Sequence, residues 1–333
     1  MQRERNYSID AMRIISAFAV VVMHFNFGTS VGWVINAMLW YAVPFFLITS
    51  GYYIMGDELV NEKLRKSLKK NLKLFLKVSI LLLAINIEYN ILKGTNINYN
   101  AEAIYKFVIF NEWPFVLGGP MWYLQSVIYA EVFFIIIEKT QLKKYYNIIM
   151  SFFLVVNVCV GELSGILRLP CIKGNFFTRA IPYMLLGRCL RINAEKIKKI
   201  KDKYLLLLLV SSIIICYLEY VILKLCGELV YKGHFIGNGI LAVILFELCM
   251  NHPTYMKNSI FNKFGKEYSL GIYLLHQPLG ELLLSCTSIF NIKCLNIIKP
   301  VVIFVLSIWM IKCYENIKYK FQKYVMIRGM IFK

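Results

Sequence analysis

The chain has 333 residues, of which 59% are hydrophobic and 17% charged, and its mean hydropathy is +0.59. This composition excludes an ordinary soluble domain and predicts an all-α, polytopic integral membrane protein. A net charge of +19 would favour a nucleic-acid partner in a soluble protein. Here the basic residues lie in short connections between apolar runs, where they set topology, so we expect no nucleic-acid partner.

Ten apolar segments of about twenty residues are each long enough to cross a bilayer. They are residues 9–27, 33–55, 72–92, 120–138, 146–161, 176–191, 204–224, 234–250, 268–288 and 297–313. Lysine and arginine are concentrated in alternate connections, which by the positive-inside rule places both termini in the cytoplasm. We therefore predict one domain of about ten transmembrane helices over 1–333, with a helical core at 1–318 and a basic cytoplasmic tail at 319–333.

The first apolar segment carries three ionisable residues. Arg13 and His24 are eleven residues apart, so in a helix they share a face and lie roughly 16 Å apart along the axis. Asp10, three residues before Arg13, joins the same stripe. Ionisable residues at membrane depth are normally retained for a function. We expect the stripe to run most of the way across the membrane, and the segment to be retained because it has no small-residue cleavage site.

The second apolar segment and the connection after it allow two interpretations each. Pro44 interrupts helical hydrogen bonding, and Ser50 beside Gly51 permits close helix approach, so the segment is a kinked packing helix or part of a binding site. The basic, amphipathic stretch from Gly56 to Lys73 lies on anionic headgroups or holds the phosphates of a cytosolic cofactor. The candidate phosphate ligands are Arg65, Lys69, Lys70 and Lys73.

Two further aromatic or basic positions lie toward the predicted outer surface. Residues 101–119 are too polar to span and too apolar for a free loop, which indicates a re-entrant or interfacial piece. Trp122 and Tyr123, which follow it, are typical of an aromatic belt but are also suited to the wall of a substrate site. Arg179 in the sixth segment is buried in the bundle or snorkels to the boundary.

The ninth segment contains Tyr273 and His276, and we place His276 roughly two turns in from the cytoplasmic side. A histidine beside Pro278 can satisfy a backbone carbonyl freed by the proline, or it can take part directly in chemistry. The nine cysteines are scattered without a paired CxxC, so we expect small buried hydrophobes and no metal site.

Five motifs, taken in order, resemble the membrane-bound acyltransferase family 3. They are Ile9 to Arg13 with His24 following, Pro44 to Phe46 with Ser50-Gly51-Tyr52, Trp122-Tyr123-Leu124, Arg179 to Gly187, and Ser269 to Pro278. The Arg-x10-His element is the most specific of them. The resemblance covers essentially the whole chain and implies a single acyltransferase-3-like transmembrane domain, located in the plasma membrane.

The resemblance implies an enzyme that takes an acyl group, usually acetyl from cytosolic acetyl-CoA, to a hydroxyl of a surface glycan or lipid-linked sugar. Another acyl-CoA and a homo-oligomer are left open. His24 matches the family's essential histidine and Arg13 its partner arginine. The family's Arg-x-x-Arg element corresponds to Lys70 and Lys73, which lack the guanidinium fork. The residues that we assign to substrate binding are Ser50, Trp122, Tyr123, Arg179, Tyr273 and His276.

Acyl transfer to an alcohol needs a base for the hydroxyl proton and a group that stabilises the developing oxyanion. We expect His24 to be the base, because an unperturbed imidazole titrates near neutrality. Arg13 and Asp10 would position the pantetheine arm or tune the field at His24, since about 16 Å along a straight helix rules out direct contact.

Two other classes of protein compete with the enzyme. A secondary transporter could use Asp10, Arg13 and His24 as a proton relay. Against it, the sequence has no inverted repeat, and the basic stretch has an obvious use only if an anionic cofactor docks there. The third class, a non-catalytic membrane partner or sensor, would tolerate His24→Gln.

Overall fold

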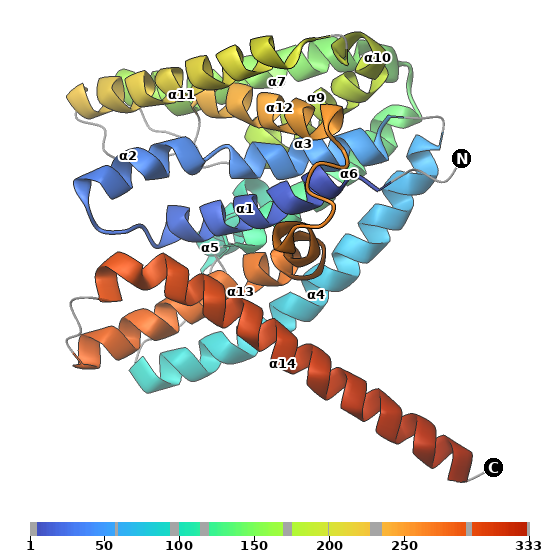
Figure 1. Ribbon diagram of the computed structural model, residues 1–333, viewed down its shortest axis with the longest axis vertical. Coiled ribbons are helices and arrows are strands. Elements are labelled where there is room, and N and C mark those ends of the chain that lie inside the picture. The colour runs from blue at the N-terminus through green and yellow to red at the C-terminus, as the bar shows by residue number, and fades with distance from the viewer. Residues whose placement is uncertain are drawn as a thin grey trace.

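The computed structural model describes residues 5–56, 59–93, 100–113, 120–168, 175–198, 200–226, 235–290 and 295–331. Every regular element in these ranges is a helix (Figure 1). The helices are α1 (Tyr7–His24), α2 (Ser30–Leu39), α3 (Ala42–Ile54), α4 (Val60–Lys93), α5 (Ala101–Phe110), α6 (Met121–Glu138), η2 (Gln141–Tyr145), α7 (Tyr146–Val158), η3 (Cys159–Leu163), α8 (Ser164–Ile166), η4 (Phe176–Ala180), α9 (Ile181–Ile192), α10 (Ala194–Ile197), α11 (Asp202–Leu225), α12 (Ile236–Asn251), α13 (Ile260–Phe290) and α14 (Leu295–Ile331).

The helices coincide with the apolar segments of the sequence. Within the described ranges, six stretches are long and apolar enough to cross a membrane, and Ile236–Asn251 is a shorter apolar helix. The six are Tyr7–His24, Ser30–Ile54, Met121–Glu138, Gln141–Ile166, Asp202–Leu225 and Ile297–Lys320. The chain is therefore a polytopic helical membrane protein, as predicted. The count of ten spans and the cytoplasmic location of both termini stay predictions.

The helices pack in a bundle with α1 and α3 in the middle (Figure 1). On one side α3 contacts α9 and α12, and α12 contacts α11. On the other side α1 contacts α13, and α13 contacts α14. α4 crosses the bundle obliquely and packs on α6, while the end of α14 projects away from the body (Figure 1). This arrangement places α1, which carries the ionisable stripe, between α3 and α13.

Among the described helices, α1 and α13 form the most extensive pair. A Cβ atom on Gly265 would lie 1.6 Å from the carbonyl oxygen of Asp10, and one on Gly280 would lie 1.9 Å from the ring of Phe25. The contacts advance together along both chains, so the two helices run parallel. Residues at matching heights on α1 and α13 therefore face one another from end to end.

Glycine also sets the approach of α3 and α9. Cβ atoms on Gly51 and Gly187 would lie 1.9 Å from the Met184 carbonyl oxygen and 2.1 Å from the Ile48 carbonyl oxygen. The predicted close approach at Gly51 is thus confirmed. The second apolar segment is also broken, between the end of α2 and the start of α3. In a continuous helix the residue at position 44 would donate its N–H to the carbonyl of Trp40. Pro44 has no N–H, so this hydrogen bond is missing at the break.

Two helices are longer than expected. The basic stretch before Lys73 is not a separate surface helix, because α4 continues without interruption from Val60 to Lys93. The predicted tail at 319–333 likewise continues α14 as far as Ile331. In both cases charged and apolar residues share one helix, since lysine, glutamate and leucine are all good helix formers. Residues 332 and 333 lie outside the described ranges.

The predicted interfacial piece is helical over α5. This helix leaves Ile104, Tyr105, Val108 and Ile109 exposed, as expected of a helix at a membrane boundary. The side-chain amide of Gln125 on α6 donates to the Phe107 carbonyl (2.9 Å) and ties α5 to the bundle. Residues 114–119 of the predicted piece lie outside the described ranges.

Replacing Gly265 by alanine should destabilise the bundle, because the new methyl group meets a backbone carbonyl of α1 that cannot rotate away. We expect a loss of roughly 1–3 kcal/mol, measured as thermal unfolding of the purified protein in detergent. Gly165→Ala is the control, since its methyl group would meet only the end of the Leu223 side chain at 3.1 Å. Equal melting temperatures for the two variants would contradict this packing.

Candidate functional site

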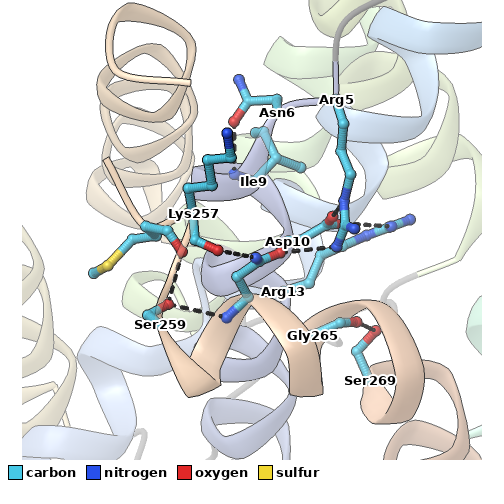
Figure 2. Close-up of polar contacts among 11 residues, drawn as sticks. Arg5, Asn6, Ile9, Asp10, Arg13, Lys257, Ser259, Gly265 and Ser269 are labelled. Carbon is cyan, nitrogen blue, oxygen red and sulfur yellow. Dashed lines mark hydrogen bonds and ion pairs between the residues drawn. The ribbon is translucent and has the colours of Figure 1, made fainter. Parts of the chain in front are cut away.

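The ionisable stripe begins in an ion-pair cluster at the first turn of α1. The Asp10 carboxylate lies 2.7 Å from the Arg5 guanidinium and 3.6 Å from that of Arg13, and the Asp10 residue is only 8% exposed. Arg5 also donates to the side-chain oxygen of Asn262 on α13 (2.8 Å). Figure 2 shows Asp10 between the two arginines, beside the start of α13. Asp10 therefore fixes Arg13, and it is linked to Asn262 on α13 through Arg5.

A pocket of about 320 Å³ lies between α1, α3, α4, α6 and α13. Five of the predicted site residues line it, each from a different helix. They are Arg13, Ser50, Lys70, Tyr123 and Tyr273. Ser50 donates its hydroxyl to the Phe46 carbonyl at 2.9 Å. Residues that are far apart in the sequence thus converge on one space, which has the size of a small-molecule site.

Glu131 on α6 is a pocket residue that the sequence analysis missed. It is fully buried, and one carboxylate oxygen accepts from the side-chain amide of Asn71 at 2.9 Å. Its other oxygen has no hydrogen-bond partner among the described residues. Asp10 was selected because it is an ionisable residue inside an apolar segment. Glu131 meets the same criterion, so the sequence could have identified it. Asn71, Ser67 and Ser269 also line the pocket.

One basic residue of α4 lines the pocket. Of the four predicted phosphate ligands, only Lys70 lines the pocket. Arg65, Lys69 and Lys73 are exposed on the neighbouring surface of the same helix. The structure therefore separates a lysine at the pocket from three cations that face outward beside it.

A line of aromatic rings connects the pocket to His24. The ring centroids of Tyr123 and Tyr273 are 5.3 Å apart, and those of Tyr273 and His276 are 6.1 Å apart. The His276 ring lies 5.1 Å from the His24 ring. The structure thus brings the two histidines together, with the two tyrosines between them and the pocket. Neither histidine lines the pocket itself.

His276 lies level with His24, not two turns into the bundle from the opposite end. The reason is that α13 begins at Ile260, eight residues before the predicted segment, so His276 is about 24 Å along the helix. The residue lies in a helix, as predicted, but at a different depth from the predicted one. His24 is exposed at the end of α1, whereas His276 is fully buried.

The hydrogen bonds of His276 define its tautomer. Its Nδ1 lies 2.7 Å from the Tyr273 carbonyl and 3.2 Å from the Ile272 carbonyl, so Nδ1 carries the proton. Pro278 frees a different carbonyl, that of Leu274, so His276 does not compensate for the proline. Nε2 is buried and has no partner among the described residues. Its lone pair is therefore available to accept a proton or a hydrogen bond.

Arg179 is held between two indole rings. Its guanidinium carbon lies 5.3 Å from the centre of the Trp40 ring and 5.5 Å from that of Trp122, and the residue is 2% exposed. Of the two interpretations, burial is therefore correct and snorkelling is wrong. Trp122 is half-buried and packs on this arginine as well as on Tyr123.

The indole cluster is joined to the end of α1. Trp40 donates its ring N–H to the side-chain oxygen of Asn36 at 3.1 Å. The Asn36 amide in turn donates to the Val22 and Met23 carbonyls, at 3.2 and 3.1 Å. These carbonyls belong to the last turn of α1, where helical partners are missing. Asn36 therefore fixes the turn that carries His24, a role that sequence patterns did not indicate.

A helical membrane bundle with a polar central pocket defines a class that includes both membrane enzymes and transporters. The model of acyltransferase family 3, described as an acyltransferase domain, matches residues 6–311. The chain belongs to this family, which supports a membrane acyltransferase and confirms the resemblance found in the motifs. No curated protein and no solved structure matches the chain.

Arg179→Lys keeps the charge but loses the planar group that stacks between two indoles. We expect a loss of roughly 1–2 kcal/mol in stability, read from thermal unfolding in detergent, together with a change in tryptophan fluorescence. Arg65→Lys, at an exposed position on α4, should leave both unchanged. If the two variants behave alike, the indole cluster does not depend on the guanidinium.

Proposed function

We propose that the protein transfers an acyl group, in the first place acetyl, from a cytosolic acyl-CoA to a hydroxyl of a surface glycan or lipid-linked sugar. Family membership supports the acyl transfer. The observation that carries the finer proposal is the line of residues from Lys70 and Arg13, past Tyr123 and Tyr273, to the two histidines. We place the acyl donor at the pocket and the acceptor at the His24 end.

The pocket residues suit the donor. Lys70 would pair with a phosphate of the CoA nucleotide, and the exposed cations of α4 would attract this anionic molecule to the mouth. Pantetheine contains amide N–H groups, and the unpartnered oxygen of Glu131 is an acceptor for one of them. Arg13, held by Asp10, would position the arm from the opposite wall. These contacts come from three helices, α1, α4 and α6, so binding also orients the thioester.

The histidines suit the chemistry of transfer. His24 would remove the proton from the acceptor hydroxyl, whose oxygen then attacks the thioester carbonyl. His276 would act on His24, since the two rings are 5.1 Å apart and the Nδ1 of His276 is fixed by the backbone. The buried Tyr273 hydroxyl, at the pocket end of the ring line, would donate to the developing oxyanion. CoA leaves as the thiol once the proton is returned to sulfur.

Arg179 and Trp122 have a different role in this proposal. Because Arg179 is buried between indoles, it is a positioning residue that holds Trp122 in place and does not itself meet the acceptor. Trp122, which is half-buried, would form part of the acceptor wall. The sugar would then lie on the exposed side of His24.

His24→Ala should abolish acyl transfer while protein abundance is unchanged, because the residue is exposed at a helix end. Loss of a general base costs roughly 10²- to 10⁴-fold in rate. The assay follows release of CoA from acetyl-CoA by purified protein in liposomes with added acceptor, and mass spectrometry of surface glycans from cells. Unchanged glycan acylation would overturn the role of His24. A proton-gradient-dependent flux without acetyl-CoA consumption would identify a transporter instead.

Lys70 and Lys69 are adjacent, but only Lys70 lines the pocket. Lys70→Ala should raise the KM for acetyl-CoA roughly tenfold, the effect of losing one charge-assisted contact, with a smaller change in kcat. Lys69→Ala removes the same charge from the outward face and serves as the matched control. Equal KM values for the two variants would mean that the nucleotide binds elsewhere.

A further inference from the structure

A second polar pocket, of about 250 Å³, lies where η2 and α7 meet the end of α9. Three cations line it, namely Lys143, Lys144 and Arg188, together with the side-chain amides of Asn147 and Asn193. No aspartate or glutamate is among its described lining residues. None of these residues belongs to the acyl-transfer site proposed above, so the pocket calls for its own explanation.

The three cations of this pocket make no ion pair with any residue in the described part of the chain. Arg188 instead stacks on the ring of Tyr146, with its guanidinium carbon 4.7 Å from the ring centre. The Tyr146 hydroxyl donates to the Glu138 carboxylate at 3.0 Å, which fixes the ring. The guanidinium is therefore held in place while its N–H donors stay available to an anion.

An apolar stripe leads away from the pocket along α7. Ile148, Phe152 and Val155 follow one another at spacings of four and three residues, so they share one face of the helix. Each is more than 60% exposed, within a stretch that is apolar enough to cross a membrane. In a bilayer this face contacts lipid chains. The cations thus lie at the end of a lipid-facing stripe, where phospholipid headgroups are found.

We propose that this pocket binds the headgroup phosphate of an anionic phospholipid, whose acyl chains lie along Ile148, Phe152 and Val155. Clusters of lysine and arginine between transmembrane helices are suited to acidic headgroups. A soluble nucleotide would use the three cations but not the apolar stripe, which is why the lipid is the better fit. The site is independent of the proposed acyl transfer and would attach the α7–α9 side of the bundle to acidic lipid.

The test measures lipid binding to the purified full-length protein by native mass spectrometry. Lys143→Gln/Lys144→Gln removes two exposed cations without touching the Arg188–Tyr146 stack, so folding should be unaffected. A second variant adds Arg188→Gln. Lys196→Gln/Lys201→Gln is the control, since these exposed lysines on and after α10 do not line the pocket. The probes are phosphatidylglycerol, phosphatidylcholine and adenosine 3′,5′-bisphosphate, which carries two phosphates of CoA.

We expect phosphatidylglycerol to bind the wild type and the control equally, and the lysine double variant roughly tenfold more weakly. Phosphatidylcholine should bind all proteins weakly and alike. Unchanged phosphatidylglycerol binding in both pocket variants would overturn the proposal. Displacement of the lipid from the wild type by the bisphosphate, lost in the pocket variants, would also overturn it, because the pocket would then be a nucleotide site.

Discussion

The candidate site depends on the parallel packing of α1 against α13. Glycine at two positions, Gly265 and Gly280, allows the backbones to approach at both ends of the shared interface. In parallel helices, residues at the same distance from the two N-terminal ends lie side by side. The ionisable stripe of α1 therefore faces one side of α13 along its length. This is why His276 meets His24 although 252 positions separate them in the chain. A larger residue at either glycine would separate the stripes before it changed any polar contact.

Much of the fold could be predicted because apolar length alone defines a membrane helix. The family could be predicted from the Arg-x10-His element, which fixes two ionisable residues on one helical face. Of the six residues that the sequence assigned to substrate binding, Ser50, Tyr123 and Tyr273 line the pocket, whereas Trp122, Arg179 and His276 do not. The sequence could not provide the depth of His276. Helix starts are set by local capping and packing, and α13 begins eight residues earlier than predicted, so His276 lies midway along α13, level with the end of α1.

Other features were hidden for different physical reasons. The role of Asn36 depends on where the last carbonyls of α1 lie, and no spacing in the sequence records that. The separation of Lys70 from Lys69 depends on the rotation of α4 against α6, which packing decides. Arg179 was ambiguous because burial and snorkelling are equally consistent with an arginine near a boundary. Its 2% exposure and its two tryptophan neighbours distinguish them. Glu131, in contrast, could have been identified, because it is an acidic residue within an apolar segment.

The tyrosine pair between the pocket and the histidines has a consequence for the membrane itself. An open aqueous channel from one face to the other would dissipate the proton gradient and expose a thioester to hydrolysis. In this structure the rings of Tyr123 and Tyr273 are in contact and lie between the pocket and the two histidines. In the proposed reaction these two rings would have to separate for the acyl group to reach His24, so the same pair of side chains would serve as both barrier and passage.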